Sequence, residues 1–227
     1  MLEQTSTTIH FFSSHFEQVV TVESNPLAHK VLKINCESTM NVRIFEIALG
    51  DSKSKSLLIN HNANFANGHL AKFHKDEIVT VNDRTFTIAE VEVSTLDDFL
   101  NQELLKPEIV KIDTEGSELD ILKGGEIYFT EKSPIVLVEL AESTFIDFRK
   151  NIVIEQLKLY GYTDFAIADY AIPTDEHLSF EVFCLNLLKL FYKKNYLKFN
   201  WVPYPKKGAH RIVIAVSVNR PFSKSKL

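Results

Sequence analysis

The apolar positions change between a strand-like and a helix-like period along most of the chain. Strands are expected where β-branched and aliphatic residues run together, as is typical of strands covered on both faces. Such runs occur at residues 18–22, 42–49, 109–112, 135–140, 164–168 and 211–216. Helices are expected where apolar residues recur every three or four positions. Such spacing occurs at residues 7–16, 27–36, 94–101, 118–122 and 145–159.

This alternation of strands and helices predicts an α/β fold with a doubly wound, mostly parallel sheet and right-handed connections. The last strand, at residues 211–216, could run antiparallel at the edge. One stretch departs from it. Residues 56–59 and 77–93 alternate apolar and polar positions, and Asn82 and Asp83 mark a tight turn. An antiparallel hairpin is therefore expected before the next parallel strand, with a polar loop at residues 61–74.

Local signals mark the starts of two of the expected helices. Asn25 suits the N-cap of the helix after the first strand, which has a proline in its first turn. Ser94 or Thr95 suits the N-cap of a shorter helix. The first turn of that helix holds Asp97 and Asp98, whose charge complements the helix dipole.

Length and composition fit a single domain. The chain has 227 residues, of which 45% are hydrophobic, and this content is ample for one core. Residues 1–220 are expected to form that domain and residues 221–227 a basic tail. A further helix is expected within residues 182–192. The aromatic residues there, with Trp201 and Tyr204, suit an ordinary core, and a lid or a homodimer surface is the alternative.

Charge and cysteine content argue against several classes of protein. A net charge of −5 gives no electrostatic footprint for nucleic acid. Neither the two cysteines nor the eight histidines show the spacing of a metal site, so no metal is expected. No run approaches the roughly 20 apolar residues of a membrane span, and no leader opens the chain. A cytoplasmic protein with reduced thiols and no membrane partner is expected.

Acidic side chains follow one expected strand directly. Asp113 and Glu115 lie on the same side of an extended chain just past residues 109–112, and Gly116 allows a tight turn or a close approach to a ligand. In an open α/β sheet, this end of a strand lies where ligands bind. The pair could include a base with a raised pKa, or bind a cationic ligand or a hard metal. A purely structural acidic turn is the remaining interpretation.

Three further acids each have a structural alternative. Glu23 follows the strand at residues 18–22 and could accept hydrogen bonds from both ribose hydroxyls of a nucleoside, or only help to cap the next helix. Glu118 falls in the first turn of a helix, where a capping acid is the simpler interpretation. Glu139 ends its strand at the same edge as Asp113 and is a secondary site candidate.

Four segments together resemble one protein family. They are VVTVESNP at residues 19–26, TLDDFL at 95–100, VKIDTEGSELDILKGG at 110–125 and PIVLVEL at 134–140. Their order and spacing are similar to those of the FkbM family of S-adenosylmethionine-dependent methyltransferases, over about residues 4–170. The D-T-E-G-S-E segment is the most specific element of the resemblance.

The resemblance implies a Rossmann-like class I methyltransferase domain with a central sheet of seven strands. It implies that Glu23 binds the ribose of the cofactor, with Ser24 and Asn25 beside it. It also implies that the backbone of Ala48 and Leu49 flanks the adenine. The implied cofactor is S-adenosylmethionine.

The resemblance also implies a reaction. Asp113 and Glu115 would lie beside the acceptor and the methionine end of the cofactor, as the catalytic residues, and Asp113 would contact the cofactor as well. Family members typically methylate hydroxyl groups, often on sugars or other small metabolites. The implied acceptor is therefore a hydroxyl of a small molecule or a glycan.

The start of the chain departs from the family pattern. Family members open with a strand and a Gly-rich turn, roughly D-x-G-A-N-x-G, which holds the methionine part of the cofactor at a helix N-terminus. This sequence aligns only from the point after that turn, and no glycine precedes Gly50. The first strand is therefore expected to be absent, with an exposed apolar groove in its place and weak or absent cofactor binding.

Two other classes of function are alternatives. A catalytically inactive relative that acts as a binding or partner subunit is favoured by the missing Gly-rich turn. A dinucleotide-dependent oxidoreductase is disfavoured, because the chain has no G-x-G-x-x-G pattern.

Overall fold

The computed structural model describes residues 9–61, 64–70, 86–114, 116–140, 144–147, 150–167, 200–202 and 212–219. The chain forms two compact units, Met1–Ser94 and Thr95–Leu227. The turn at Asn82 and Asp83, the helix within residues 182–192 and the tail at residues 221–227 lie outside the described residues. These features, and the single domain over residues 1–220, stay predictions.

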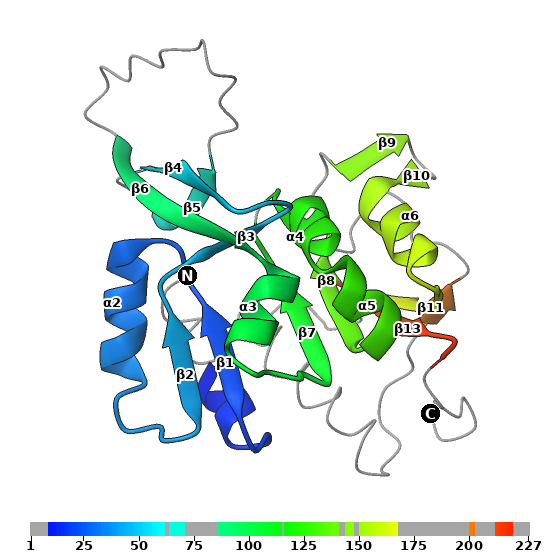
Figure 1. Cartoon of the computed structure of the whole chain (residues 1–227), viewed down its shortest axis with the longest axis horizontal. Coiled ribbons are helices and arrows are strands. Elements are labelled where there is room, and N and C mark those ends of the chain that lie inside the picture. Colours follow the sequence, from blue (N-terminus) through cyan, green and yellow to red (C-terminus); the bar gives the residue numbers. More distant parts are fainter. Residues whose placement is uncertain are drawn as a thin grey trace, which may run out of the picture. The chain divides into compact units, whose positions relative to one another are not determined.

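The first unit contains a pair of parallel strands, β1 (Val19–Val22) and β2 (Val42–Phe45), in which Val22 lies opposite Phe45. Helix α2 (Pro26–Asn35) connects them and packs against β2 (Figure 1). Both strands are only half-buried. The expectation that the strand at residues 18–22 is covered on both faces is therefore wrong. Among the described residues, its sheet has only two strands.

The predicted start of α2 is confirmed. The side-chain oxygen of Asn25 accepts hydrogen bonds from the backbone N–H groups of Leu27, at 3.0 Å, and Ala28, at 3.4 Å. Asn25 thus satisfies two of the donors that the first turn of a helix leaves open. The buried face of the helix then joins an apolar cluster formed by Ile9, Leu32 and Cys36, with Val42 and Ile44 against it.

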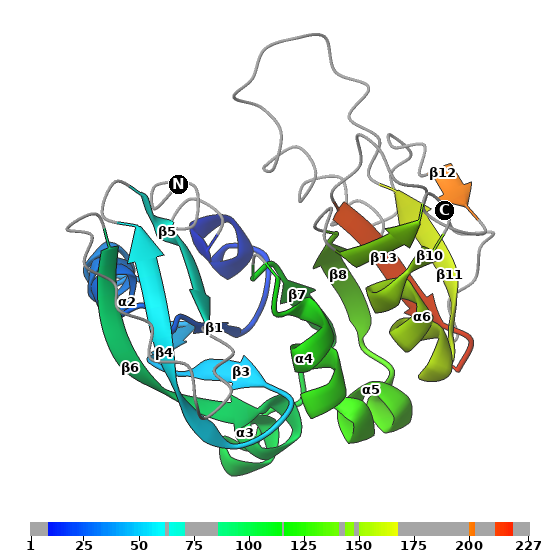
Figure 2. The same ribbon diagram turned by 90° about the horizontal axis from the view of Figure 1, so that it is seen from above.

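A separate four-stranded sheet in the same unit has the order β3-β6-β4-β5. Figure 2 shows β4 between β5 and β6. The strands are β3 (Ala48–Gly50), β4 (Ser54–His61), β5 (Asn64–Leu70) and β6 (Phe86–Thr95). The antiparallel pairing of β4 with β6 confirms the expected hairpin partners. The loop expected at residues 61–74 is wrong for residues 64–70, because β5 pairs with β4 in an antiparallel ladder.

The continuous strand expected at residues 42–49 is wrong as well. It breaks after Phe45, and β3 begins at Ala48 in the other sheet. Strand β3 approaches β6 closely at Gly50, where an added Cβ would lie 2.9 Å from a methyl carbon of Val93. The short break at residues 46–47 therefore carries the chain from the parallel pair to the four-stranded sheet.

The second unit is built on a five-stranded sheet of order β12-β11-β13-β8-β7 (Figure 2). Only β7 (Ile109–Ile112) and β8 (Ile135–Glu139) pair in parallel. Strand β13 (Ile212–Ser217) runs antiparallel to both β8 and β11 (Tyr162–Ile167), and β12 (Asn200–Val202) runs antiparallel to β11. This sheet is therefore mixed, and the expectation of a mostly parallel sheet is wrong. The antiparallel direction considered for the strand at residues 211–216 is confirmed, but β13 lies between β8 and β11 and not at the edge.

Helices α4 (Glu118–Gly124) and α6 (Ile152–Leu159) pack against each other on one face of this sheet, as Figures 1 and 2 show together. The core beneath them includes Phe129, Leu157 and the buried residues of β8. The hydroxyl of Tyr162 donates a hydrogen bond of 2.8 Å to the carbonyl of Pro134, just before β8. Strand β8 is thereby fixed within the core.

The helix expected at residues 145–159 begins only at Ile152. Before it lie two short antiparallel strands, β9 (Phe145–Asp147) and β10 (Lys150–Asn151). The helix starts late because the buried side chain of Asn151 accepts the backbone N–H groups of its first turn, as an N-cap does.

Helix α5 (Glu126–Lys132), which the sequence analysis did not expect, is capped from another element. Asp97 belongs to the first turn of α3 (Leu96–Gln102), as expected. Its carboxylate also accepts the backbone N–H groups of Ile127, at 3.0 Å, and Tyr128, at 2.9 Å. Asp97 thus fixes the helix that leads into β8.

Candidate functional site

The first part of the candidate site lies at the carboxyl ends of β1 and β2. The backbone N–H of Glu23 donates a hydrogen bond of 2.9 Å to the carbonyl of Phe45, so Glu23 and Glu46 leave adjacent strands at the same level. Ligands of open α/β sheets bind at this end of the strands. Within the first unit, the structure brings Glu23 and Glu46 together at such an edge.

Glu23 is half-buried, and only one of its oxygens is engaged. Oε1 accepts a hydrogen bond of 2.8 Å from the backbone N–H of Asn25, and among the described residues no other donor reaches this carboxylate. Burial raises the pKa of Glu23, and the Asn25 N–H lowers it only in part. The bond to Asn25 supports the structural role considered for Glu23. The remaining lone pairs suit hydroxyl donors of a ligand.

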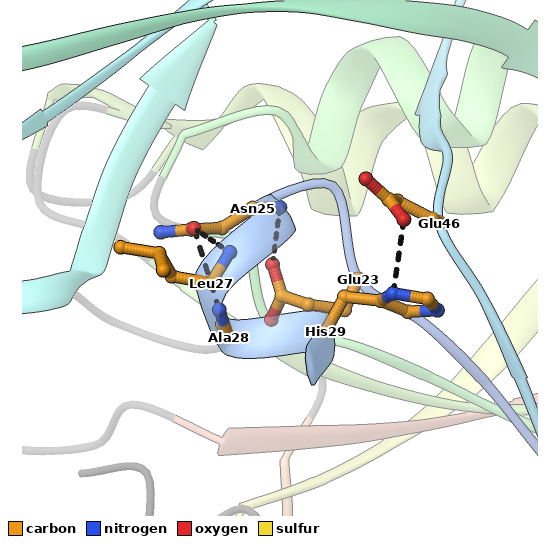
Figure 3. Close-up of polar contacts among 6 residues, drawn as sticks. All are labelled: Glu23, Asn25, Leu27, Ala28, His29 and Glu46. Carbon is orange, nitrogen blue, oxygen red and sulfur yellow. Dashed lines mark hydrogen bonds and ion pairs between the residues drawn. The ribbon is translucent and has the colours of Figure 1, made fainter. Parts of the chain in front are cut away.

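Ser24 and Asn25 complete the turn between β1 and α2. Ser24 is half-buried, whereas Asn25 is 4% exposed and its side-chain oxygen is committed to the start of α2 (Figure 3). Asn25 therefore shapes the turn that presents Glu23. Direct contact of Ser24 or Asn25 with a cofactor stays a prediction.

His29 faces this rim from α2, and sequence reasoning missed it. Its Nδ1 lies 3.1 Å from Oε2 of Glu46, and its side chain is 4% exposed (Figure 3). The available signal was the helical spacing of His29 from Leu32 and Cys36, which places it on the buried face of α2.

The expected adenine contacts at Ala48 and Leu49 are not equivalent. Ala48 is buried in a cluster with Leu58, Val91 and Val93, so its side chain belongs to the four-stranded sheet. Leu49 is half-buried and points to the opposite face, since side chains alternate along a strand. A ligand at this point would meet the backbone of Ala48 or the side chain of Leu49.

The second part of the candidate site lies at the carboxyl ends of β7 and β8. Ile112 lies opposite Val138, so Asp113 and Glu139 follow at the same level, and their side chains are hydrogen-bonded. Asp113 also forms an ion pair with Lys111, which projects from the same side of β7.

The electrostatics of Asp113 differ from the expectation of a base with a raised pKa. Burial raises the pKa of Asp113, but the charge of Lys111 and hydrogen bonds from Glu139 and Lys111 outweigh that effect. The pKa therefore lies below its ordinary value, and Asp113 is ionised at neutral pH. Asp113 is therefore not the acid with a raised pKa in the expected pair, because a cation lies beside it. Glu115 lies outside the described residues, and its catalytic role stays a prediction.

Glu118 holds the loop that follows β7. It is 1% exposed, and its Oε1 accepts hydrogen bonds from Thr114 N at 3.3 Å, Thr114 Oγ1 at 3.2 Å and Gly116 N at 2.9 Å. Gly116 has a φ of 121°, which favours glycine, so the tight turn expected there is confirmed. Glu118 is a structural acid, as expected, and it stabilises the loop before its helix.

Glu23 and Asp113 belong to different units, so their placement along one common edge stays a prediction. Among the described residues, no group of three or more His, Cys, Asp and Glu side chains could hold a metal ion. None of the described helices combines the length and the apolar character that a membrane span requires.

Replacing Glu118 with Ala should lower the free energy of unfolding by about 1–3 kcal/mol, because it leaves the N–H groups of Thr114 and Gly116 without their acceptor. Glu118→Gln keeps an oxygen in place of Oε1 and should cost less, about 1 kcal/mol. Urea unfolding at fixed pH measures both. An alanine variant as stable as the parent would contradict the role of Glu118 in this loop.

Replacing Glu23 with Gln should change how stability depends on pH. The raised pKa means that the native state keeps this proton to higher pH than the unfolded chain. Protonation of Glu23 therefore stabilises the folded state at low pH, and this stabilisation is lost as the pH rises through the raised pKa. The variant should therefore unfold less readily than the parent near neutral pH, and the difference should shrink towards about pH 4. Urea unfolding across this range, with the exposed Glu17→Gln as control, tests the sign.

Comparison with known proteins relates this chain to one family. The model of the methyltransferase FkbM domain matches residues 4–168. No curated protein matches the chain. A crystal structure of methyltransferase FkbM from Methylobacillus flagellatus KT is similar, with a TM-score of 0.40, 18% sequence identity, and coverage of 61% of this chain and 30% of that one. This chain spans less than a third of that protein. Because the family model matches well over half of its residues, the chain belongs to the FkbM methyltransferase family.

Proposed function

We propose that this chain transfers a methyl group from S-adenosylmethionine to a hydroxyl of a small molecule or a glycan. The observation that carries the proposal is Glu23, a half-buried carboxylate at the end of a parallel strand that keeps an oxygen open to ligands. Membership of the FkbM methyltransferase family supports the type of reaction.

Glu23 suits the ribose of the cofactor. A carboxylate at the end of the second strand of a nucleotide-binding unit commonly accepts hydrogen bonds from both ribose hydroxyls. The engaged Oε1 fixes the orientation of the Glu23 side chain, and the open oxygen provides the acceptor. Because the pKa of Glu23 is raised, its carboxylate becomes protonated at a higher pH than that of an ordinary glutamate. Ribose binding should therefore begin to weaken at that higher pH as the pH falls.

Two acids of the second unit, Asp113 and Glu115, suit the binding of a cationic group and the removal of a proton. Bound S-adenosylmethionine supplies the methyl group from its sulfonium, in an in-line displacement that depends mainly on positioning. Asp113, ionised at neutral pH, favours a cationic group beside it. With its lowered pKa, Asp113 is a weak proton acceptor, so Glu115 is the stronger candidate for removing the acceptor hydroxyl proton.

An inactive methyltransferase-fold subunit is the second candidate. The charge of Asp113 is already compensated by Lys111 and by the hydrogen bond from Glu139. A site that must bind a cation gains less from a carboxylate that already has a cationic partner. This observation favours a protein that binds a partner without transferring methyl groups.

S-adenosylhomocysteine should bind the parent chain weakly, and Glu23→Gln should lower its affinity about 10- to 100-fold further. The reason is that hydrogen bonds to a charged group contribute about 1.5–3 kcal/mol. Isothermal titration calorimetry of both chains measures the difference. Glu17→Gln, the same change on an exposed residue, should leave the affinity unchanged.

Equal affinity of the parent and Glu23→Gln would contradict the ribose assignment. No binding by a folded parent chain would overturn the proposed methyl transfer and favour the inactive subunit.

A further inference from the structure

We propose that His29 and Glu46 are a positioning pair for the nucleoside-binding rim of the first unit. Their contact holds the break between β2 and β3 against α2, and so sets the spacing between Glu23 and the backbone of Ala48 and Leu49. This inference rests on the proposed function, in which an adenosyl group is the ligand of that rim.

A continuous series of hydrogen bonds joins the two sides of the rim. Oε1 of Glu23 accepts from the N–H of Asn25 at 2.8 Å, and the carbonyl of Asn25 accepts from the N–H of His29 at 2.8 Å. Nδ1 of His29 then meets Oε2 of Glu46 at 3.1 Å. Figure 3 shows the side-chain contacts at both ends of this series. A change in the His29–Glu46 contact is therefore transmitted directly to the turn that holds Glu23.

The location of Glu46 explains how its contact with His29 affects the position of the turn between β2 and β3. Glu46 is the first residue after β2, at the point where the chain leaves the parallel pair for the four-stranded sheet. Backbone pairing fixes β2 up to Phe45, and the next strand begins at Ala48. The side chain of Glu46 anchors the intervening turn to α2. Ala48 and Leu49 thus start from a position that α2 defines.

Stability alone does not explain this pair. Among the described residues, Nε2 of His29 is buried with no hydrogen-bond partner, and a buried unsatisfied nitrogen costs free energy. The Glu46 side chain is 50% exposed, so solvent weakens its attraction to His29. An apolar side chain of similar size at position 29 would avoid the cost of Nε2. What the imidazole adds is a directed contact from Nδ1 to Glu46.

Two substitutions at position 29 distinguish the effect of the contact with Glu46 from the effect of packing at this position. The side-chain nitrogen of asparagine is the same number of bonds from the backbone as Nδ1, so His29→Asn keeps a donor for Glu46. His29→Leu fills the site with apolar atoms and removes that donor. Volume-conserving apolar replacements of this kind cost little stability and can raise it.

The experiment compares the parent, His29→Asn and His29→Leu in three measurements on the full chain. Calorimetry gives the affinity for S-adenosylhomocysteine, urea unfolding gives stability, and hydrogen exchange gives the protection of the backbone amides at residues 46–49. His29→Leu should bind about five- to tenfold more weakly, the effect of losing roughly one hydrogen bond. It should keep the stability of the parent and exchange faster at residues 46–49. His29→Asn should resemble the parent in affinity and exchange.

Several results would overturn the inference. One is a folded His29→Leu variant with unchanged affinity and unchanged exchange at residues 46–49. Another is an equal loss of affinity in His29→Asn and His29→Leu, which would point to packing. If the parent binds no S-adenosylhomocysteine, the proposed function fails, and hydrogen exchange alone still decides whether His29 fixes this turn.

Discussion

Parallel pairing of strands is the constraint from which the chemistry of this chain follows. Where two strands run in parallel, their carboxyl ends meet, and the residues that follow lie side by side. The pairing of β1 with β2 places Glu23 next to Glu46, and the pairing of β7 with β8 places Asp113 next to Glu139. In the antiparallel ladders that make up the rest of the described sheets, the carboxyl ends of paired strands lie at opposite edges. Each unit therefore has one edge at which carboxyl groups gather.

The two edges differ because of the cation at one of them. Glu23 is half-buried, its carboxylate has a single backbone donor, and burial raises its pKa. Asp113 is exposed, and Lys111 and Glu139 lower its pKa. The carboxyl group of Glu23 is thus suited to accept hydrogen bonds from neutral hydroxyl groups. The carboxyl group of Asp113 carries a fixed negative charge. This difference in partners separates nucleoside binding from charge stabilisation in the proposed reaction.

The sequence predicted those parts of the fold that local signals determine. Asn25 identified the start of α2, and Gly116 identified the turn after β7, because caps and positive φ angles depend on a few adjacent residues. The break after Phe45 and the place of β13 between β8 and β11 depend on pairing between distant segments, which a pattern along the chain does not contain. The site shows the same division. Glu23 and Asp113 were found from their strands, whereas the contacts of His29 with Glu46 and of Lys111 with Asp113 required the structure.

The measurement that tests the central claim most directly is a crystal structure of this chain with S-adenosylhomocysteine. The account predicts both ribose hydroxyl oxygens within about 3 Å of the Glu23 carboxylate, with its bond to Asn25 retained. A nucleoside bound elsewhere, while Glu23 contacts only Asn25, would show that the carboxyl end of β1 is not where the adenosyl group is recognised.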